Sequence, residues 1–198
     1  MNRLQATRCL VDTLARDAAA PVVASLGHPA YDLFAAGDRP ANFYTWASMG
    51  LASSIGLGLA LARPDLPVFV VDGDGSLLMN LGSLATIGWT KAKNLVLIVW
   101  DNQEYATTGG QPTATAHGAD LEGAARAMGI PVTVTARDEA QLRAALAAAR
   151  NGSGPSVIVA KVSESAPAAK PPLDCVFIKQ RFMSAIGNPE PATEGTRS

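Results

Sequence analysis

The sequence predicts an α/β fold: a doubly wound, mostly parallel sheet with helices on both faces. Three observations lead to this prediction. Short apolar runs typical of buried strands alternate with longer stretches of helical periodicity, and Gly, Pro, Asp or Asn residues mark the changes between them. The 198 residues are 48% hydrophobic and only 17% charged, which suits one domain with a substantial core. Alternating strands and helices favour parallel pairing, because parallel strands need long crossover connections.

The first quarter of the chain contains the first expected elements. A helix is expected over residues 2–19, where the apolar positions 4, 10, 11 and 14 share one face and Pro21 ends the pattern. A strand at 22–25, a short helix at 30–36 and an aromatic strand at 43–46 are expected to follow.

Residues 50–62 form an unusual helical stretch. It contains three glycines and no charge. Each glycine weakens a helix by about 1 kcal/mol relative to alanine, so a close approach to the backbone must justify them. We expect this helix to be buried on every side. A position inside the domain and a tight subunit interface both explain that burial, and both remain open.

Polar side chains follow two apolar strands in the middle of the chain. Strand 68–71 runs into Asp72-Gly73-Asp74-Gly75-Ser76, a helix is expected at 77–92, and strand 94–100 ends in Asp101-Asn102. Neighbouring parallel strands end at the same sheet edge, where doubly wound folds bind ligands. Carboxylate and amide oxygens suit Mg²⁺, and N–H groups at a helix start favour an anion. The stretch therefore predicts a magnesium diphosphate site at Asp74 and Asn102.

The rest of the chain continues the alternation. A long Thr- and Gly-rich loop at 103–118 favours a functional role. It is followed by a helix at 120–128, a strand at 132–134, a helix at 138–150 and a strand at 156–162. We expect one domain over residues 1–163. A C-terminal extension follows over 164–187, with a Pro/Ala linker at 163–172 and a short helix at 176–186, and a disordered tail covers 188–198.

Composition excludes several classes of partner. The net charge is −1 without a basic run, so neither nucleic acid nor a membrane surface is an expected partner. The two cysteines, Cys9 and Cys175, form neither a metal pair nor a disulfide framework, which favours a cytoplasmic protein. Charged residues interrupt the first twenty positions, which argues against a signal peptide, and the sequence has no apolar stretch long enough to span a bilayer.

The central motif resembles that of a known enzyme family. Gly73-Asp74-Gly75, a spacing of some two dozen residues and then Asp101-Asn102 resemble the thiamine diphosphate motif, with Asp101 in place of its first Asn. Ala47-Ser48-Met49-Gly50 precedes the motif, and Thr-Gly-Gly-Gln-Pro-Thr at 108–113 follows it. Together, over roughly residues 20–160, they resemble the cofactor-binding (β) subunit of sulfopyruvate or phosphonopyruvate decarboxylases, a branch that tolerates Asp-Asn.

The resemblance implies a role for each matching position. Mg²⁺ would be held by Asp74, by Asn102 and by the backbone carbonyl of Glu104. The carbonyl of Ala47 would accept from the cofactor's 4′-amino group, and Met49 would press the cofactor into its bent, reactive conformation. The full set of implied cofactor contacts is Gly27, Ala47, Ser48, Met49, Gly73, Asp74, Gly75, Ser76, Asn102, Glu104, Tyr105 and Ala106.

His28 is the candidate catalytic residue of this chain. It follows the first strand at the ligand edge, so contact with substrate and a solvent-exposed or capping role are both open. The resembled enzymes are associated with an Arg or Lys near Tyr31-Asp32, and none stands there. Either a partner chain supplies the group that binds the anion, or the substrate lacks a sulfonate or phosphonate.

The resemblance implies one subunit of a heteromeric, thiamine diphosphate- and Mg²⁺-dependent decarboxylase that converts a small 2-oxoacid into CO₂ and an aldehyde. The catalytic glutamate would come from an α subunit carrying the pyrimidine-binding domain, in an α2β2 or larger assembly. Two alternatives are a thiamine-binding subunit of a 2-oxoacid oxidoreductase, which usually carries clustered cysteines, and a non-catalytic regulatory subunit that binds thiamine diphosphate.

Overall fold

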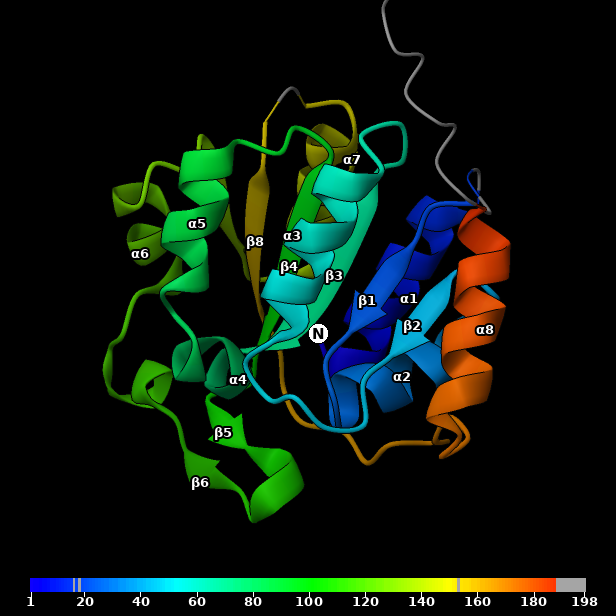
Figure 1. The fold of residues 1–198 in the computed structure, drawn as a ribbon. Coiled ribbons are helices and arrows are strands. Elements are labelled where there is room, and N and C mark those ends of the chain that lie inside the picture. The colour runs from blue at the N-terminus through cyan, green and yellow to red at the C-terminus, as the bar shows by residue number, and fades with distance from the viewer. Residues whose placement is uncertain (16, 18, 153, 188–198) are drawn as a thin grey trace, which may run out of the picture.

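The protein was examined as a computed structural model, which describes residues 1–187 except 16, 18 and 153. A fully parallel sheet forms its centre (Figure 1). From edge to edge its strands are β2 (Asn42–Tyr44), β1 (Val22–Ala24), β3 (Val68–Gly73), β4 (Leu95–Asp101), β8 (Ser156–Lys161) and β7 (Val132–Ala136). The predicted doubly wound α/β fold is confirmed.

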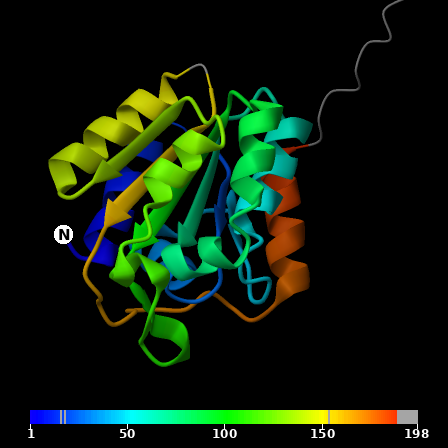
Figure 2. The same ribbon diagram turned by 90° about the vertical axis from the view of Figure 1, so that its left-hand side faces the viewer.

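Helices cover both faces of the sheet, as Figures 1 and 2 show. One face carries α1 (Arg3–Leu14), α2 (His28–Gly37) and α7 (Glu139–Arg150). The opposite face carries α3 (Ala52–Ala62), α4 (Asp74–Met79), α5 (Ser83–Thr90) and α6 (Leu121–Ala127). The last helix, α8 (Cys175–Ile186), packs beside β2, where Phe182 lies 5.3 Å from Phe43 between ring centroids.

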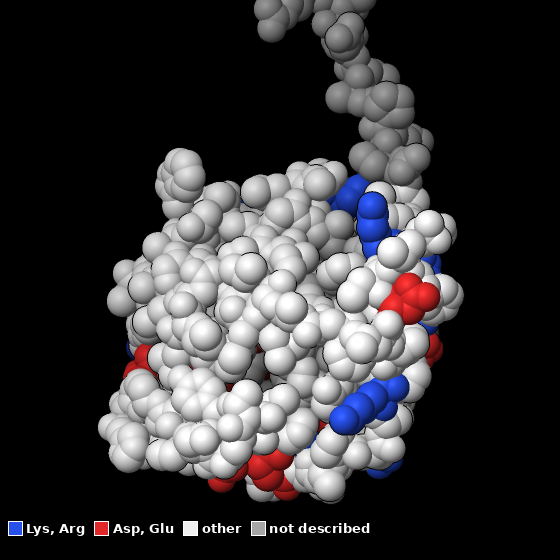
Figure 3. All heavy atoms as spheres, turned by 60° about the horizontal axis from the view of Figure 1, so that its bottom comes forward, with Lys and Arg blue, Asp and Glu red and all other residues white. Residues whose placement is uncertain are grey.

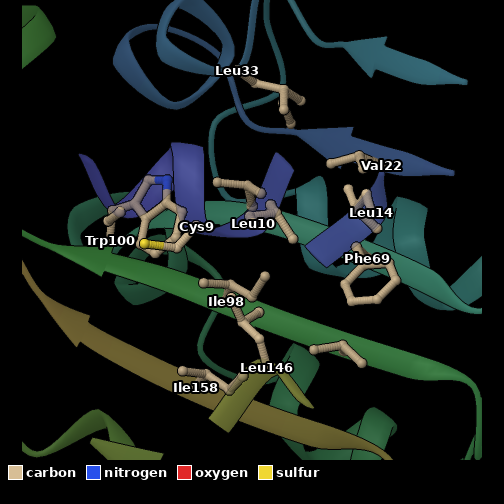
Figure 4. Close-up of a cluster of buried hydrophobic side chains, with 14 of the residues drawn as sticks. Cys9, Leu10, Leu14, Val22, Leu33, Phe69, Ile98, Trp100, Leu146 and Ile158 are labelled. Atoms are coloured by element: carbon tan, nitrogen blue, oxygen red, sulfur yellow. The ribbon is translucent and has the colours of Figure 1, made fainter. Parts of the chain in front are cut away.

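Each face has its own apolar core, because the central strands are buried on both sides. Figure 4 shows Leu10 of α1 and Leu146 of α7 converging on Phe69, Ile98 and Ile158 from three neighbouring strands. All five side chains are fully buried. Continuous apolar strands of this kind are typical of parallel sheets. This rigid centre fixes the strand ends that carry the site.

The helix predicted at 77–92 is wrong as a single element. It begins earlier, at Asp74, and is broken between α4 and α5 at residues 80–82. Asn80 leaves the helical conformation, and its side-chain amide donates to the carbonyl oxygen of Gly50 at 2.9 Å. This contact with a distant turn ends α4, so the hydrophobic pattern alone did not reveal the break.

Within this chain, helix 50–62 is buried on one side only, so its expected burial on every side stays a prediction that depends on a partner. The sheet side is tight, since a Cβ added to Gly56 would lie 2.0 Å from a methyl group of Val70. The other side is open: a Cβ on Gly58 would meet nothing within 4 Å, and Leu61 is 54% exposed. Packing inside the domain therefore explains Gly56 but not Gly58.

The ends of the chain differ from their predicted form. The first helix ends at Leu14 rather than at residue 19. Ser163, in the predicted linker, donates its N–H to the Met1 carbonyl and accepts from the N–H of Arg3, both at 3.1 Å. Trp46 also donates to the carbonyl of Pro172 at 3.0 Å. The division of the chain at 163 stays a prediction, and the tail 188–198 lies outside the described residues.

The long loop after β4 contains short elements of its own. They are β5 (Glu104–Tyr105), the 3₁₀ turn η1 (Ala106–Thr108), β6 (Gln111–Pro112) and the 3₁₀ turn η2 (Ala114–His117). β5 and β6 pair antiparallel and project beyond the carboxyl edge of the sheet (Figure 1). Over the described part of the chain, every helix is too short or too polar to cross a bilayer.

Candidate active site

The carboxyl ends of β1, β3 and β4 open into one pocket. Gly73 pairs with Trp100 across β3 and β4, so the residues that follow them emerge side by side. The pocket encloses about 540 Å³, its open mouth included. Its lining residues are Arg3, Ser25, Leu26, His28, Pro29, Met49, Gly73, Asp74, Gly75, Ser76, Trp100, Asn102, Glu104, Tyr105, Ala106, Thr107 and Thr108. Ten of the predicted site residues therefore share one cavity.

Asp74 is the most buried acid of this pocket. It opens α4, its residue is 1% exposed, and its Oδ2 accepts from the hydroxyls of Thr113 at 2.5 Å and Thr115 at 2.9 Å. Burial raises the pKa of Asp74, and the nearby Asp101 carboxylate raises it further, although the threonine hydroxyls oppose the shift. A bound cation would remove this penalty, so the environment of Asp74 fits a metal ligand.

Asn102 and Glu104 line the same pocket as Asp74. The side-chain oxygen of Asn102 accepts from the backbone N–H of Glu104 at 3.3 Å, which turns the two toward each other. Within the described residues, no cluster of three or more His, Cys, Asp or Glu side chains suits a metal ion. A site of one carboxylate, one amide and one carbonyl agrees with that finding, since Mg²⁺ commonly completes its shell with phosphate oxygens and water.

The two glycines of the motif differ in how much space surrounds them. A Cβ on Gly73 would meet nothing within 4 Å, so the backbone there is open to a ligand. A Cβ on Gly75 would lie 2.4 Å from the ring of Tyr105, which packs directly over the glycine. The hydroxyl of Ser76 accepts from the N–H of Gly50 at 2.9 Å. The backbone of Gly73 is therefore open to a ligand, and Ser76 connects α4 to the turn before α3.

Asp101, the departure from the Asn-Asn pattern, has its own compensation. It is 2% exposed, and its carboxylate forms an ion pair with Lys161 at the end of β8. The hydroxyl of Thr115 lies 2.8 Å from the other oxygen of Asp101 and 2.9 Å from Oδ2 of Asp74, so its single proton can be donated to either carboxylate. The lysine offsets the extra negative charge that an aspartate brings to this position.

Three predicted residues lie outside the pocket lining. Ala47 and Ser48 are exposed in the segment between β2 and α3, and Ser48 has a left-handed φ of 69°. Gly27 precedes α2 with φ of 76°, and a Cβ there would lie 2.4 Å from the hydroxyl oxygen of Thr107. Gly27 thus allows the loop after β4 to approach α2. The cofactor contacts assigned to these three residues stay predictions.

His28 faces the pocket from the start of α2, with its side chain 18% exposed. Burial, assisted by the positive charge of Arg3, lowers the pKa of His28. The imidazole is therefore neutral at neutral pH. Its Nδ1 lies 3.4 Å from Glu164 Oε2.

Sequence reasoning missed several residues of the site. Arg3 comes from α1, Trp100 is the penultimate residue of β4, and Glu164 follows β8. Glu164 is ionised: burial opposes its charge, but hydrogen bonds from Arg3 and Asn102 and the charge of Arg3 outweigh it and lower the pKa. The position of Glu164 just after a strand is the same signal that revealed Asp74 and Asn102.

Comparisons with known proteins agree with this geometry. Residues 30–160 match the family described as "Thiamine pyrophosphate enzyme, C-terminal TPP binding domain". The sulfopyruvate decarboxylase subunit beta of Methanocaldococcus jannaschii is 43% identical over 166 residues, covering 83% of this chain and 87% of that protein. This chain belongs to the thiamine pyrophosphate enzyme family. It is a subunit of the decarboxylase branch, and thiamine diphosphate with Mg²⁺ is its cofactor.

One further relative and one solved structure contain the same fold within longer chains. Phosphonopyruvate decarboxylase of Streptomyces viridochromogenes is 37% identical over 194 residues, which cover 97% of this chain but 48% of that protein. The structure of benzoylformate decarboxylase from Polynucleobacter necessarius superposes with a TM-score of 0.67 at 19% identity, covering 84% of this chain and 34% of that one. The fold described here thus forms only part of these two longer chains.

Proposed function

We propose that this chain is the cofactor-binding subunit of a heteromeric decarboxylase acting on a small 2-oxoacid with an anionic tail, of the sulfopyruvate or phosphonopyruvate kind. The observation that carries the proposal is that Asp74, Asn102 and Glu104 line one pocket together with the open backbone of Gly73. The products would be CO₂ and an aldehyde, and the setting would be the cytoplasm.

Each residue of this chain has a distinct task in the proposal. Bound thiamine diphosphate supplies the nucleophilic carbon and the electron sink for decarboxylation. Asp74, Asn102 and the carbonyl of Glu104 would hold Mg²⁺. Met49, half-buried at the pocket wall, would support the reactive shape of the cofactor. His28, neutral at this site, would offer a hydrogen bond or a proton position to the substrate without adding charge.

In our proposal, a lysine of the C-terminal extension attracts the anionic group of the substrate. The sequence has no Arg or Lys in the loop near Tyr31, but the ammonium of Lys170 lies 5.2 Å from the centroid of the Tyr31 ring. Arg3 is less suited, because its guanidinium already donates to Asp32, Glu164 and the carbonyl of Ser165. We therefore assign Lys170 as the group that attracts the sulfonate or phosphonate.

The partner would be an α subunit that carries the pyrimidine-binding domain and the catalytic glutamate. The proposed partner surface is the face that bears α3 and α5. In Figure 3 most charged side chains lie near the outline of the molecule, and the middle of the view is largely uncharged. Large apolar side chains are exposed there: Leu61 at 54%, Met79 at 61% and Trp89 at 82%. Exposed apolar side chains on one face are consistent with a surface that binds a partner. Two copies of each chain are the simplest stoichiometry.

The test compares the purified chain with the complex formed with its cognate partner. The chain alone should show no decarboxylation of sulfopyruvate or phosphonopyruvate and should retain thiamine diphosphate poorly, whereas the complex should be active. Gly58→Leu, on the open side of α3, should block assembly without unfolding the chain. Gly56→Leu is the control, because its side chain would collide with Val70 and lower stability. Full activity of the isolated chain would overturn the proposal.

The oxidoreductase alternative finds no support in the cysteines. Cys9 is buried in α1, and Cys175 is exposed at the start of α8. A cysteine-bound iron–sulfur cluster requires several thiolates at one place. A regulatory subunit without catalysis is the outcome in which the complex binds thiamine diphosphate but converts neither substrate.

A further inference from the structure

Glu164 lies beyond residues 30–160, which match the family model, yet its carboxylate contacts a proposed ligand of the metal. It follows β8 by three positions and is 30% exposed at its side chain. Its Oε1 accepts from the side-chain amide nitrogen of Asn102 and from a guanidinium nitrogen of Arg3. Glu164 is therefore a direct neighbour of a proposed Mg²⁺ ligand.

The carboxylate of Glu164 is held from behind by a buried cation. Arg3 is only 2% exposed. Its Nε donates to Asp32, and its Nη2 donates to the carbonyl of Ser165 at 2.7 Å. A guanidinium fixed at three points has little freedom left, so the carboxylate that it holds is fixed as well. The network joins α1, α2 and the segment after β8 to the end of β4.

The geometry matters because the two ends of an asparagine amide differ chemically. Only the oxygen of Asn102 can ligate Mg²⁺, whereas the NH₂ group can only donate hydrogen bonds. An ionised carboxylate can only accept, so Glu164 selects the orientation in which the nitrogen faces it. The oxygen of Asn102 then points to the side of Glu104, whose N–H it accepts at 3.3 Å.

We propose that Glu164, anchored by Arg3, is a positioning residue that presets the amide of Asn102 for Mg²⁺. This inference rests on the proposed function and adds a residue that acts on the metal site through Asn102. Groups behind metal ligands typically contribute 10- to 100-fold to metal affinity. Because the amide is already oriented, no reorientation would be needed when the metal and diphosphate arrive.

The test uses the complex with the partner chain and measures the Mg²⁺ concentration that gives half-maximal thiamine diphosphate binding by calorimetry. Glu164→Ala should raise this concentration by about 10-fold or more. Glu164→Gln should raise it similarly, because its own NH₂ can donate to the oxygen of Asn102 and so favour the wrong orientation. Melting temperatures are measured in parallel, since Glu164 is partly exposed and neither variant should unfold the chain.

Asp174→Ala is the matched control. This carboxylate lies in the same C-terminal extension and caps α8 by accepting from the N–H of Phe177 at 2.9 Å, away from the pocket lining. Its loss should lower the melting temperature and leave the Mg²⁺ requirement unchanged.

Three outcomes decide the matter. An unchanged Mg²⁺ requirement in both Glu164 variants, or a normal requirement in Glu164→Gln alone, would overturn the positioning role. Wild-type complex that binds thiamine diphosphate without any need for Mg²⁺ would instead overturn the proposed function.

Discussion

Asp74→Asn should invert the order of stability between variant and wild type when the cofactor is added. Asn is nearly isosteric, and its oxygen can still accept from the hydroxyls of Thr113 and Thr115. Burial raises the pKa of this carboxyl group, so its charged form costs folding free energy. Removing that charge while keeping the hydrogen bonds should stabilise the cofactor-free protein by about 1 kcal/mol.

The magnitudes follow from the size of the domain. In a protein of this length 1 kcal/mol corresponds to about 3 °C in melting temperature. Without cofactor, Asp74→Asn should therefore melt about 3 °C above wild type. At 100 times the dissociation constant, Mg²⁺ and thiamine diphosphate stabilise the wild type by about 2.7 kcal/mol, or about 8 °C. The variant should gain nothing, and so melt about 5 °C below wild type.

Thermal melts followed by circular dichroism, with and without Mg²⁺ and thiamine diphosphate, provide the assay. They are run on the complex with the partner chain. Asp138→Asn is the control, because Asp138 caps α7 and asparagine caps a helix equally well. An Asp74→Asn protein that melts below wild type without cofactor would refute the electrostatic reasoning. A normal cofactor-induced rise in that variant would refute the metal site.

Two further predictions concern neighbouring positions. Met49→Ala should lower kcat on the order of 100-fold while cofactor affinity changes little, because a misplaced reactive group slows the reaction without weakening binding. Steady-state kinetics and calorimetry measure the two quantities, and equal losses in kcat and affinity would indicate damaged packing only. Lys161→Met should cost about 3 kcal/mol in urea unfolding, since Asp101 is left buried and unpaired. Adding Asp101→Asn to that variant should recover most of the loss, and strictly additive effects would contradict the charge-compensating pair.

Most of the fold was predictable because its signals are local in sequence. Apolar runs such as 68–71 and 94–100 became β3 and β4 with bounds that differ by at most two residues. The break between α4 and α5 was not predictable, because Asn80 leaves the helix to bond the turn at Gly50, thirty positions away. The sequence left open whether the far side of α3 faces the core or a partner. A run without charge looks the same whether it faces a core or a partner.

The site residues likewise differ in whether a local sequence signal marks them. Asp74 and Asn102 were found because each follows a strand, and neighbouring parallel strands bring such residues together. Glu164 follows a strand as Asp74 and Asn102 do, but its pairing with Arg3 was not found, because Arg3 lies 161 positions away and no local pattern links the two. Thr115 is intermediate. The loop that carries it was expected to be functional, but only the folded chain reveals that its hydroxyl lies between two carboxylates.

The turn at Gly50 connects the proposed partner surface to the proposed cofactor site. Its N–H donates to the hydroxyl of Ser76, and its carbonyl accepts from Asn80, so both peptide groups of this turn are fastened to α4. That helix begins with Asp74, and α3, the proposed partner surface, begins two residues after Gly50. A partner that fixes the position of α3 would therefore also fix the start of α4, where Asp74 lies. By thermodynamic reciprocity, thiamine diphosphate must strengthen subunit association by the same factor as the partner strengthens thiamine diphosphate binding. Apparent cofactor affinity should consequently rise with subunit concentration, and dilution should empty the site before it unfolds the chain.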